Sequence, residues 1–510
     1  MHACLLIPEI IKLIFCDIFY SSGNLEVGYR PDRRVSRCSL AALSRVCHSF
    51  KDIALDVLWT ELNDLEPLFS CLPQDLWTKT REGKLVIRRT VTIADWSIFE
   101  RYASRVRVLG HSNIFGGVDA EFIHAILSFS SQSILVPNLR LLECGECPRD
   151  LHSCMRYLLG PNLVRLHLTS KEEAFWTPIM CSTLSSLCRR SPRLQIVELA
   201  ATSSGVSELA LRELPYLRNL ELTLHGNEDF SWLSCLVGLQ ELSVEITAPF
   251  APVKSHFRAQ SSLNHLVIHS STLTLIGKMV VGWVVPCTQL ILFSEIPETA
   301  PAVERALREL TDRVLFDGLK IIVLYVYEVP DLIDNAFTLR TFTPLMHFSS
   351  LKEISLERFC MSLLDDDALG SIVKSWPNLE NLYLGTWRFW KTPPKITFRG
   401  LVAVLSSCPN LRKLGLVFDA KKVALPTAEK PGGGVSNTNI TTFGVGCSPI
   451  ARPLQVAVAL SAVLPCLKEI KVESALPERP DRMARQVKWD EVLEDISVFT
   501  LIRRQEGMRL

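Results

Sequence analysis

The spacing Leu-x-x-Leu-x-Leu, usually introduced by a proline, recurs between residues 137 and 472 of this chain. It reads PNLVRLHL from Pro161, LPYLRNLEL from Leu214, WPNLENLYL from Trp376 and CPNLRKLGL from Cys408. A unit of about 20 to 30 residues can bury its apolar face only against its neighbours, so such units must stack. The chain is therefore predicted to form a stacked repeat array whose function is binding.

The first leucine of the motif can be placed repeatedly along the array. These positions are Leu139, Leu163, Leu194, Leu217, Leu239, Leu263, Leu319, Leu351, Leu379, Leu411 and Leu467. The intervals after Leu263 and after Leu411 are clearly longer than the others. We therefore expect a degenerate unit near TQLILF at Thr288, a flexible insertion at about residues 420–450, and about twelve units in all.

Each unit combines two periodicities. Leu220 and Leu222 alternate with polar residues, as in a short strand. The segment ALGSIVKSW before Pro377 instead has apolar residues at helical spacing. This pattern resembles the leucine-rich-repeat family, which implies an α/β solenoid with a curved parallel sheet and outer helices. A doubly wound α/β domain is the alternative, but its strands would be longer continuous apolar runs.

The first sixty residues have a different pattern, which predicts a small all-α domain of short helices. Ile7, Ile10, Ile11 and Ile14 follow helical spacing, and Pro8 suits a first helical turn. Ser39 is a candidate cap for a second helix, and DIALDVLW from Asp52 reads as a third. So small a domain needs further contacts, either with the repeats or with a partner.

These residues resemble the F-box of fungal proteins with leucine-rich repeats. The matching positions are Ile7, Pro8, Glu9, Ile10, Ile14 and Phe15, then Val46, Cys47 and Phe50, and finally Leu58 and Trp59. Two departures are Ile7 in place of the usual leucine and a long loop from Ser21 to Arg37. The resemblance implies an adaptor-binding surface made by Pro8, Ile11, Ile14, Leu40, Val46 and Leu58.

The same resemblance implies a partner set. The F-box would dock on a Skp-type adaptor and through it on a cullin, and the array would bind the protein substrate of a cullin-RING ubiquitin ligase. The alternative is a non-catalytic repeat scaffold whose F-box-like helices only cap the array. Either role is non-enzymatic, and the resemblance implies a cytoplasmic or nuclear location.

The expected domain boundaries follow from these patterns. They are an F-box-like domain at 1–62, a packed linker at 63–83, the array at 84–472, and a C-terminal capping helix with tail at 473–510. The array is expected to begin near LVIRRTVTI at Leu85. Helical stripes beginning at Leu65 and Trp96 are expected to cover its first strands, and one beginning at Trp489 its last.

Composition excludes several classes of partner. Lys plus Arg total 55 and Asp plus Glu 54, giving a net charge of +1 that favours neither nucleic acid nor an anionic membrane. The apolar run from Leu275 to Phe293 is divided by Pro286, so helix plus strand explains it better than a membrane span. The 16 cysteines lack paired spacing and are read as reduced residues of an intracellular protein.

Four clusters could carry chemistry, and each has a simpler interpretation. Cys144, Cys147, His152 and Cys154 approach zinc spacing, but Cys144 is also a strand core position. Asp365, Asp366 and Asp367 suit a helix start. The glycines from Gly432 are read as a flexible segment, and Arg30, Arg33, Arg34 and Arg37 as a solvated loop, with a nuclear signal or adaptor contact as alternatives. We expect no catalytic residues, metal or cofactor.

Residues that alternate with the strand leucines should point outward on the concave sheet. Those selected as substrate-binding candidates are Glu198, Glu221, Glu241, Glu245, Tyr325, Glu353, Glu357 and Tyr383. Glu198 and Glu221 are expected side by side on neighbouring strands, where like charges repel. One hypothesis is that this acidic strip binds a basic segment of the substrate with Tyr325 and Tyr383 as anchors, and the alternative is a hydrated sheet face.

Overall fold

The computed structural model of this 510-residue chain describes most of its length. The described residues are 7–20, 34–129, 134–170, 175–200, 204–225, 231–247, 257–259, 262–280, 283–296, 298–313, 318–327, 336–423, 431–473 and 480–507. The chain divides into two compact units, Met1–Thr223 and Leu224–Leu510.

In each unit the described strands form a sheet in which spatial order follows chain order and neighbouring strands run parallel. The strands that begin in the first unit are β1 (Glu61–Leu62), β4 (Val108–Asn113), β5 (Leu141–Glu146), β6 (Arg165–Leu168), β7 (Ile196–Leu199) and β8 (Asn219–His225). The second unit contains β9 (Glu241–Thr247), β10 (His265–Ser270), β11 (Gln289–Ser294), β12 (Ile321–Val326), β13 (Glu353–Leu356), β14 (Asn381–Leu384), β15 (Lys413–Leu416), β16 (Thr442–Gly446) and β17 (Glu469–Val472). The α/β leucine-rich-repeat fold class is thus confirmed.

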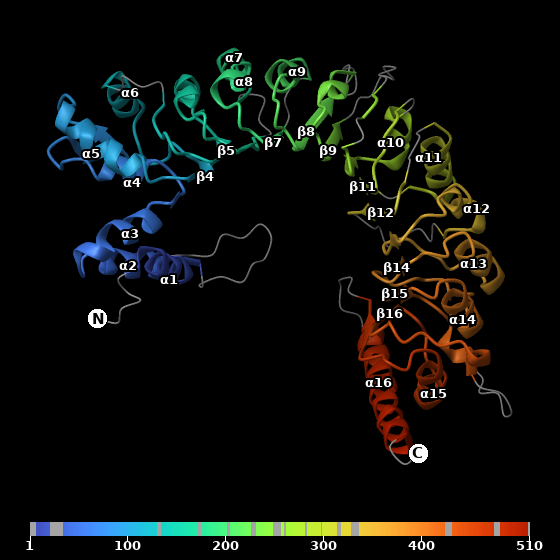
Figure 1. Ribbon diagram of the computed structural model, residues 1–510. Helices are drawn as coiled ribbons and strands as arrows, with labels where there is room; N and C mark the ends of the chain where they lie inside the picture. The colour runs from blue at the N-terminus through green and yellow to red at the C-terminus, as the bar shows by residue number, and fades with distance from the viewer. Residues whose placement is uncertain are drawn as a thin grey trace. The chain divides into compact units, whose positions relative to one another are not determined.

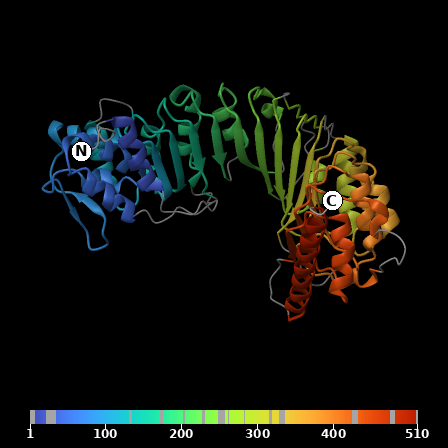
Figure 2. The same ribbon diagram turned by 60° about the horizontal axis from the view of Figure 1, so that its bottom comes forward.

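Helices of the repeats cover one face of this sheet in each unit (Figures 1 and 2). In the first unit they are α5 (Ile93–Ala103), α6 (Ala120–Phe129), η2 (Arg149–Tyr157), α7 (Pro178–Leu184), α8 (Leu187–Arg190) and α9 (Ser204–Leu211). In the second they are η4 (Ser231–Cys235), α10 (Leu273–Met279), α11 (Ala300–Arg313), α12 (Leu339–Phe342), η5 (Leu345–His347), α13 (Asp366–Val373), α14 (Phe398–Ser407), η6 (Ala420–Lys422), η7 (Pro431–Gly434) and α15 (Pro453–Val463). We call the opposite face of the sheet the open face.

The core lies between the sheet and these helices. Alternate residues of β10, β11 and β12 are buried, as in Leu266, Leu290 and Ile322. Trp376 lies between a helix and its strand, and its indole N–H donates to the carbonyl of Leu345 at 3.2 Å. Each such buried aliphatic side chain contributes about 1.5–3 kcal/mol of hydrophobic stabilisation, so stacking supplies what one unit lacks.

Each of the two long intervals between motif leucines contains one further strand of the sheet. The degenerate unit expected at Thr288 forms β11. The flexible insertion expected at about 420–450 is wrong for Thr442–Gly446, because these residues form β16, which pairs with both β15 and β17. Phe443 and Val445 take the buried positions that leucines hold elsewhere, so the leucine spacing alone missed this unit.

The start of the array also differs from the expectation. Residues from Leu85 form β3 (Leu85–Ile87), which pairs antiparallel with β2 (Trp77–Lys79) in a separate two-stranded sheet. The array instead begins with β1 and β4, which are parallel neighbours. The short helix α4 (Glu66–Ser70) and α5 pack here through Phe69 and Phe99, whose ring centroids lie 5.6 Å apart.

Three N-terminal helices form their own small core within the first unit. They are α1 (Pro8–Tyr20), α2 (Arg34–Leu43) and α3 (His48–Leu58), and we call them the helical trio. Their core consists of Ile11, Phe15, Phe19, Leu40, Ala54 and Val57. Ser39 lies inside α2 rather than capping it, since this helix begins at Arg34. Of the arginines expected in the first loop, Arg37 is in α2, whereas Arg30 and Arg33 lie outside the described residues.

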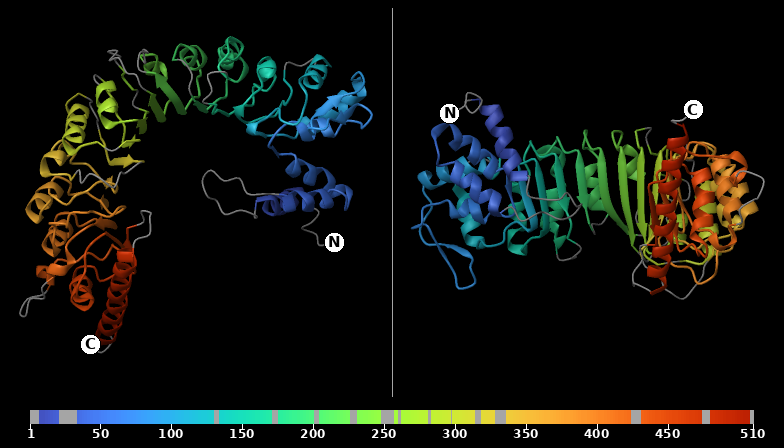
Figure 3. Two further views of the ribbon diagram at one scale, coloured as in Figure 1. Left: turned by 180° about the vertical axis from the view of Figure 1, so that it is seen from behind. Right: turned by 90° about the horizontal axis from the view of Figure 1, so that it is seen from below.

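The long helix α16 (Pro480–Gly507) packs on the last repeat of the second unit (Figure 3). Trp489, Val492 and Ile496 of this helix are fully buried, and the Trp489 indole donates to the carbonyl of Ser448 at 3.3 Å. Burial of a helical stripe over the final strand removes an exposed sheet edge from the array. Among the described residues, no helix combines the length and apolar character needed to cross a membrane.

Candidate functional site

An acidic row crosses the open face of the first unit. Parallel register places Glu143, His167, Glu198 and Glu221 in one line across β5 to β8. Glu198 and Glu221 are therefore neighbours, as the sequence predicted. The His167 Nδ1 lies 3.6 Å from Glu198 Oε2. Burial, followed by the charge of Glu143, raises the pKa of Glu198. This carboxylate would gain from a cation supplied by a partner.

Four further acidic candidates lie on the open face of the second unit. Glu241 faces His265, whose Nδ1 is 3.9 Å from the carboxylate, and Glu245 is the register partner of His269. Glu353 accepts a 2.7 Å hydrogen bond from Asn381 Nδ2. Burial raises the pKa of Glu357, while the neighbouring Arg358 acts to lower it. These carboxylates stand on both sides of β10 to β12.

Between these carboxylates lies a group of rings that sequence reasoning largely missed. His269, Phe293 and Tyr325 are register partners on β10, β11 and β12, and we call them the aromatic row. The His269 and Phe293 rings are stacked at 4.3 Å with an interplanar angle of 6°. Tyr327 stacks on Phe293 at 5.5 Å and is half exposed. The available signal was the outward position of Phe293 in TQLILF.

Two residues earlier, and so on the same face, these strands carry Val267, Ile291 and Val323, which are all only partly buried. The open face over β10 to β12 therefore combines aliphatic and aromatic side chains. Binding surfaces of proteins are typically enriched in aromatic anchors of this kind, surrounded by polar groups. This part of the face therefore carries side chains of the kind that protein-binding surfaces use.

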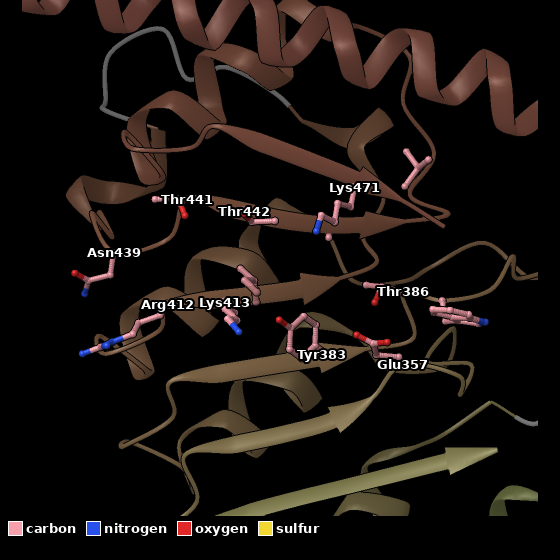
Figure 4. A pocket seen from close by; sticks show the side chains of 13 residues that line it. Glu357, Tyr383, Thr386, Arg412, Lys413, Asn439, Thr441, Thr442 and Lys471 are labelled. Carbon is pink, nitrogen blue, oxygen red and sulfur yellow. The ribbon is translucent and has the colours of Figure 1, made fainter. Parts of the chain in front are cut away.

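A depression of about 710 Å³ lies further along the open face of the second unit (Figure 4). Its lining residues are Glu357, Tyr383, Thr386, Trp387, Arg412, Lys413, Leu414, Asn439, Thr441, Thr442, Gly444, Lys471 and Val472. Burial, followed by the charges of Glu357 and Glu353, raises the pKa of Tyr383, so its hydroxyl stays protonated at neutral pH. Sequence reasoning named Glu357 and Tyr383 but not the depression. We call it the glycine hollow, because Gly444 lines it and pairs in register with a second glycine, Gly415.

The residues expected to bind an adaptor divide into two groups. Ile11 and Leu40 are 1% and 0% exposed, so they belong to the core of the helical trio and cannot dock on another protein. Ile14 and Val46 are 41% and 62% exposed, Pro8 is exposed, and Leu58 is half-buried. Leu13 is also exposed and was missed, because the N-terminal sequence is apolar around most of the helix.

The clusters discounted as chemical sites have structural roles. Both ring nitrogens of His152 are engaged, Nδ1 with Thr177 Oγ1 at 2.7 Å and Nε2 with the carbonyl of Cys147 at 3.0 Å. Among the described residues no group of His, Cys, Asp and Glu side chains could hold a metal ion. Asp365 caps α13 by accepting from the backbone N–H of Ala368 at 2.9 Å.

Comparisons with known proteins add little sequence similarity. No protein-family model matches this chain, and no curated protein sequence matches it. Among solved structures, a leucine-rich-repeat protein of Leptospira interrogans is 14% identical, with a TM-score of 0.24, over 69% of this chain and 92% of that one. The Rad7 and Elc1 complex in yeast is 14% identical, with a TM-score of 0.34, over 93% and 91%. The APL1 leucine-rich repeat domain is 13% identical, with a TM-score of 0.28, over 67% and 82%.

The recurring motif, the consecutive parallel strands and the helices on one face together define the class of protein. It is a leucine-rich-repeat solenoid. Four surfaces of the described residues stand out by their side chains. They are the acidic residues of the open face, the aromatic row, the glycine hollow and the exposed side of the helical trio. All four are surfaces suited to binding.

Proposed function

We propose that this protein is a non-catalytic substrate receptor of a cullin-RING ubiquitin ligase. In this role the helical trio docks on a Skp-type adaptor, and the open face of the repeats binds the substrate protein. The observation that carries the proposal is that α1 has both buried and exposed apolar residues. It contributes Ile11, Phe15 and Phe19 to the core of the helical trio and leaves Leu13 and Ile14 exposed.

The exposed apolar residues of α1 lie together and can form a binding surface. Ile7, Ile10 and Ile14 occupy one side of the helix at spacings of three and four residues, and Leu13 lies next to them. Ile7, Leu13 and Ile14 are 44%, 71% and 41% exposed. Clustered exposed apolar residues typically mark an interaction site, and their burial against an adaptor would supply hydrophobic free energy. This side of α1 is therefore the proposed contact surface for the adaptor.

The test replaces only exposed residues. Leu13→Asp with Ile14→Asp should abolish co-purification of a Skp-type adaptor, because two carboxylates would be buried without partners. Leu209→Asp on α9, where the leucine is 72% exposed, is the matched control and should leave adaptor binding unchanged. Retention of the adaptor by the double variant, with the control behaving as expected, would refute the proposal.

Changing Pro8 together with Ile11, the variant that the sequence suggests, is less informative. Ile11 is 1% exposed, so the substitution would disrupt the core of the helical trio as well as any surface. Loss of adaptor binding could then reflect unfolding alone.

The substrate-binding part of the proposal concerns charge. Glu221 and Glu241 lie on the open face, and Glu198 has a raised pKa that an added cation would lower. A substrate segment with basic residues and an aromatic or aliphatic anchor would complement both the acidic residues and the aromatic row. Glu221→Lys with Glu241→Lys should reduce capture of substrate proteins without loss of the adaptor. If the variant captures substrate proteins as the wild type does, the acidic residues are not a substrate site and the alternative of a hydrated sheet face holds.

A second candidate function is a plain repeat scaffold in which the helical trio only caps the array. The observation that favours it is the contact between α3 and the first repeat. Arg105 Nη2 lies 2.9 Å from Asp52 Oδ1, and the Trp59 and Tyr102 ring centroids are 4.8 Å apart. A scaffold should not bind the Skp-type adaptor, so the same co-purification experiment distinguishes the two functions.

The proposed role also implies a compartment. Every cysteine that the structure describes is a free thiol, and several, including Cys287 and Cys408, are buried. Free thiols are typical of reducing compartments. We therefore propose a cytoplasmic or nuclear location, which cell fractionation can test.

A further inference from the structure

Gly444 and its register partner Gly415 are not equivalent. At Gly415 a Cβ atom would lie 2.7 Å from Cδ1 of Tyr383 and 3.2 Å from the methyl group of Thr386. Packing of the Tyr383 ring over β15 therefore requires a glycine at position 415. This glycine needs no further explanation.

Gly444 has no such requirement. A Cβ atom there would meet its nearest neighbour at 3.4 Å, which is ordinary van der Waals contact, and its backbone does not need a positive φ. Gly446, by contrast, has a φ of 52°. Glycine weakens a strand and often marks a place where a ligand or another chain approaches the backbone closely. Gly444 therefore leaves the backbone of β16 without a side chain where it lines the hollow.

Charge around the hollow indicates the chemistry of that occupant. Arg412, Lys413 and Lys471 contribute three cations to the lining, against the single carboxylate of Glu357. Lys471 lies on the same register row as Gly444, and its Nζ is 3.6 Å from Glu469 with both side chains more than half exposed. Such an exposed ion pair is weak and easily exchanged for a better-placed anion.

Neutral donors complete the lining. The hydroxyls of Tyr383 and Thr386 lie around the same depression (Figure 4), whereas the Thr442 hydroxyl already donates to Glu469 Oε2 at 3.1 Å. The Tyr383 phenol is protonated at neutral pH and can donate, since an ordinary tyrosine pKa is about 10 and burial raises this one. Lysine ammonium groups and hydroxyl donors together suit an anionic group, because charge-assisted hydrogen bonds are about twice as strong as neutral ones.

We propose that the glycine hollow binds a negatively charged side chain, a carboxylate or a phosphoryl group, on a segment of the substrate protein. This inference rests on the proposal that the open face receives a substrate. Because residue 444 has no side chain, the segment's backbone can lie close to β16. The substrate would thus carry an acidic group here and basic groups near the acidic residues of β9 and β13.

The experiment uses the full chain and short fluorescein-labelled peptides of alternating glycine and glutamate. Matched peptides carry glutamine or phosphoserine in place of glutamate, and binding is followed by fluorescence anisotropy at low salt. The wild-type protein should bind the glutamate or the phosphoserine peptide at least about tenfold more tightly than the glutamine peptide. The tighter of the two anionic peptides identifies the source of the charge.

Two variants test the hollow itself. Gly444→Leu places a side chain in the lining of the hollow, and Lys413→Glu with Lys471→Glu reverses two of its charges. Each should weaken anionic peptide binding about tenfold or more. Lys374→Glu, at an exposed position at the end of α13, reverses one charge elsewhere, half the change of the double variant, and should bind as the wild type does. Circular dichroism melting of every variant verifies folding.

Three outcomes would overturn the inference. They are equal binding of the glutamine peptide, undiminished binding by both hollow variants, and no binding of either anionic peptide. Adaptor co-purification, measured on the same variants, should be unaffected. If the protein binds the anionic peptides but no adaptor, only the proposed ligase role is refuted. If it binds the adaptor but neither anionic peptide, only the proposed role of the glycine hollow is refuted.

Discussion

The guanidinium of Arg358 lies 3.9 Å above the ring of Tyr325, at one end of the aromatic row. Its Nη1 donates to the carbonyls of Val326 and Tyr327, each at 2.9 Å, and Nη2 donates to the Tyr325 hydroxyl. The ring of Trp387, which also lines the glycine hollow, is 4.7 Å from the same guanidinium. Arg358 thereby joins the two candidate subsites of the second unit.

Arg358→Lys should destabilise the second unit despite conserving the charge. A lysine cannot make the forked hydrogen bonds or stack flat on both rings. The expected loss is about 1–3 kcal/mol, seen as a lower midpoint in urea denaturation. Arg340→Lys, an exposed arginine on α12, should change stability by less than about 0.5 kcal/mol. Equal midpoints for the two variants would contradict the assigned role of Arg358.

Ile11→Ala should loosen the helical trio without affecting the repeats. The side chain is fully buried, so its truncation is expected to cost about 2–5 kcal/mol. Hydrogen exchange should accelerate across α1 to α3 and stay constant in β9 to β17. Leu13→Ala, at a position that is 71% exposed, serves as the control and should leave exchange unchanged. Uniform acceleration along the chain would show that the helical trio has no core of its own.

Asp95 should make stability depend on acid pH. It accepts from Arg89 Nη1 at 2.7 Å and from the backbone and hydroxyl of Thr92, and the Arg89 interaction contributes most to holding the Asp95 pKa far below its usual range. The folded state therefore binds this proton less readily than the unfolded state does. The contribution is fully present above the unfolded pKa of about 4 and is lost as pH falls towards the folded value.

The variant Asp95→Asn measures this contribution. It should cost about 1–3 kcal/mol at pH 7 and less as the pH is lowered, because the wild type itself becomes protonated. Denaturation midpoints from pH 7 down to about pH 2 give the comparison. A constant difference between wild type and variant over that range would count against the ion pair as the cause.

Glu473→Ala should be among the more damaging single substitutions in the second unit. Glu473 is 3% exposed and pairs with Arg485 of α16, whose guanidinium lies 5.1 Å from the Phe389 ring centroid. Removing the carboxylate leaves a largely buried cation without its partner, at an expected cost of about 3–5 kcal/mol. The double change Glu473→Leu with Arg485→Met should recover most of that loss in thermal unfolding. A double variant no more stable than the single one would show that the pair is needed for more than charge balance.

How far the sequence could predict the fold depended on how regular each unit is. Leucine spacing predicted the strands around Leu220 and Leu382, because a period of two on one buried face has a single solution. It also predicted that Glu198 and Glu221 are neighbours, since parallel units repeat the same register. The unit of β16 escaped prediction because Phe443 and Val445 fill the core in place of leucine.

Residues of the candidate sites were harder to predict. Ile11 and Ile14 are equally apolar, yet the first is in the core and the second is exposed, because α1 is apolar on more than one side and only packing against α2 and α3 selects the buried side. The aromatic row joins residues of β10, β11 and β12 that are far apart in the chain. No local pattern reports such a contact.

By itself, the amino-acid sequence determined that this chain stacks parallel strand-and-helix units, because a repeated apolar spacing can be buried only against another copy of itself. Tertiary structure alone decided which outward residues meet across strands, including the pair His269 and Phe293 and the pair Gly415 and Gly444. The physical reason is that burial of leucines fixes the register, whereas residues on the open face have no such requirement and acquire their neighbours from that register.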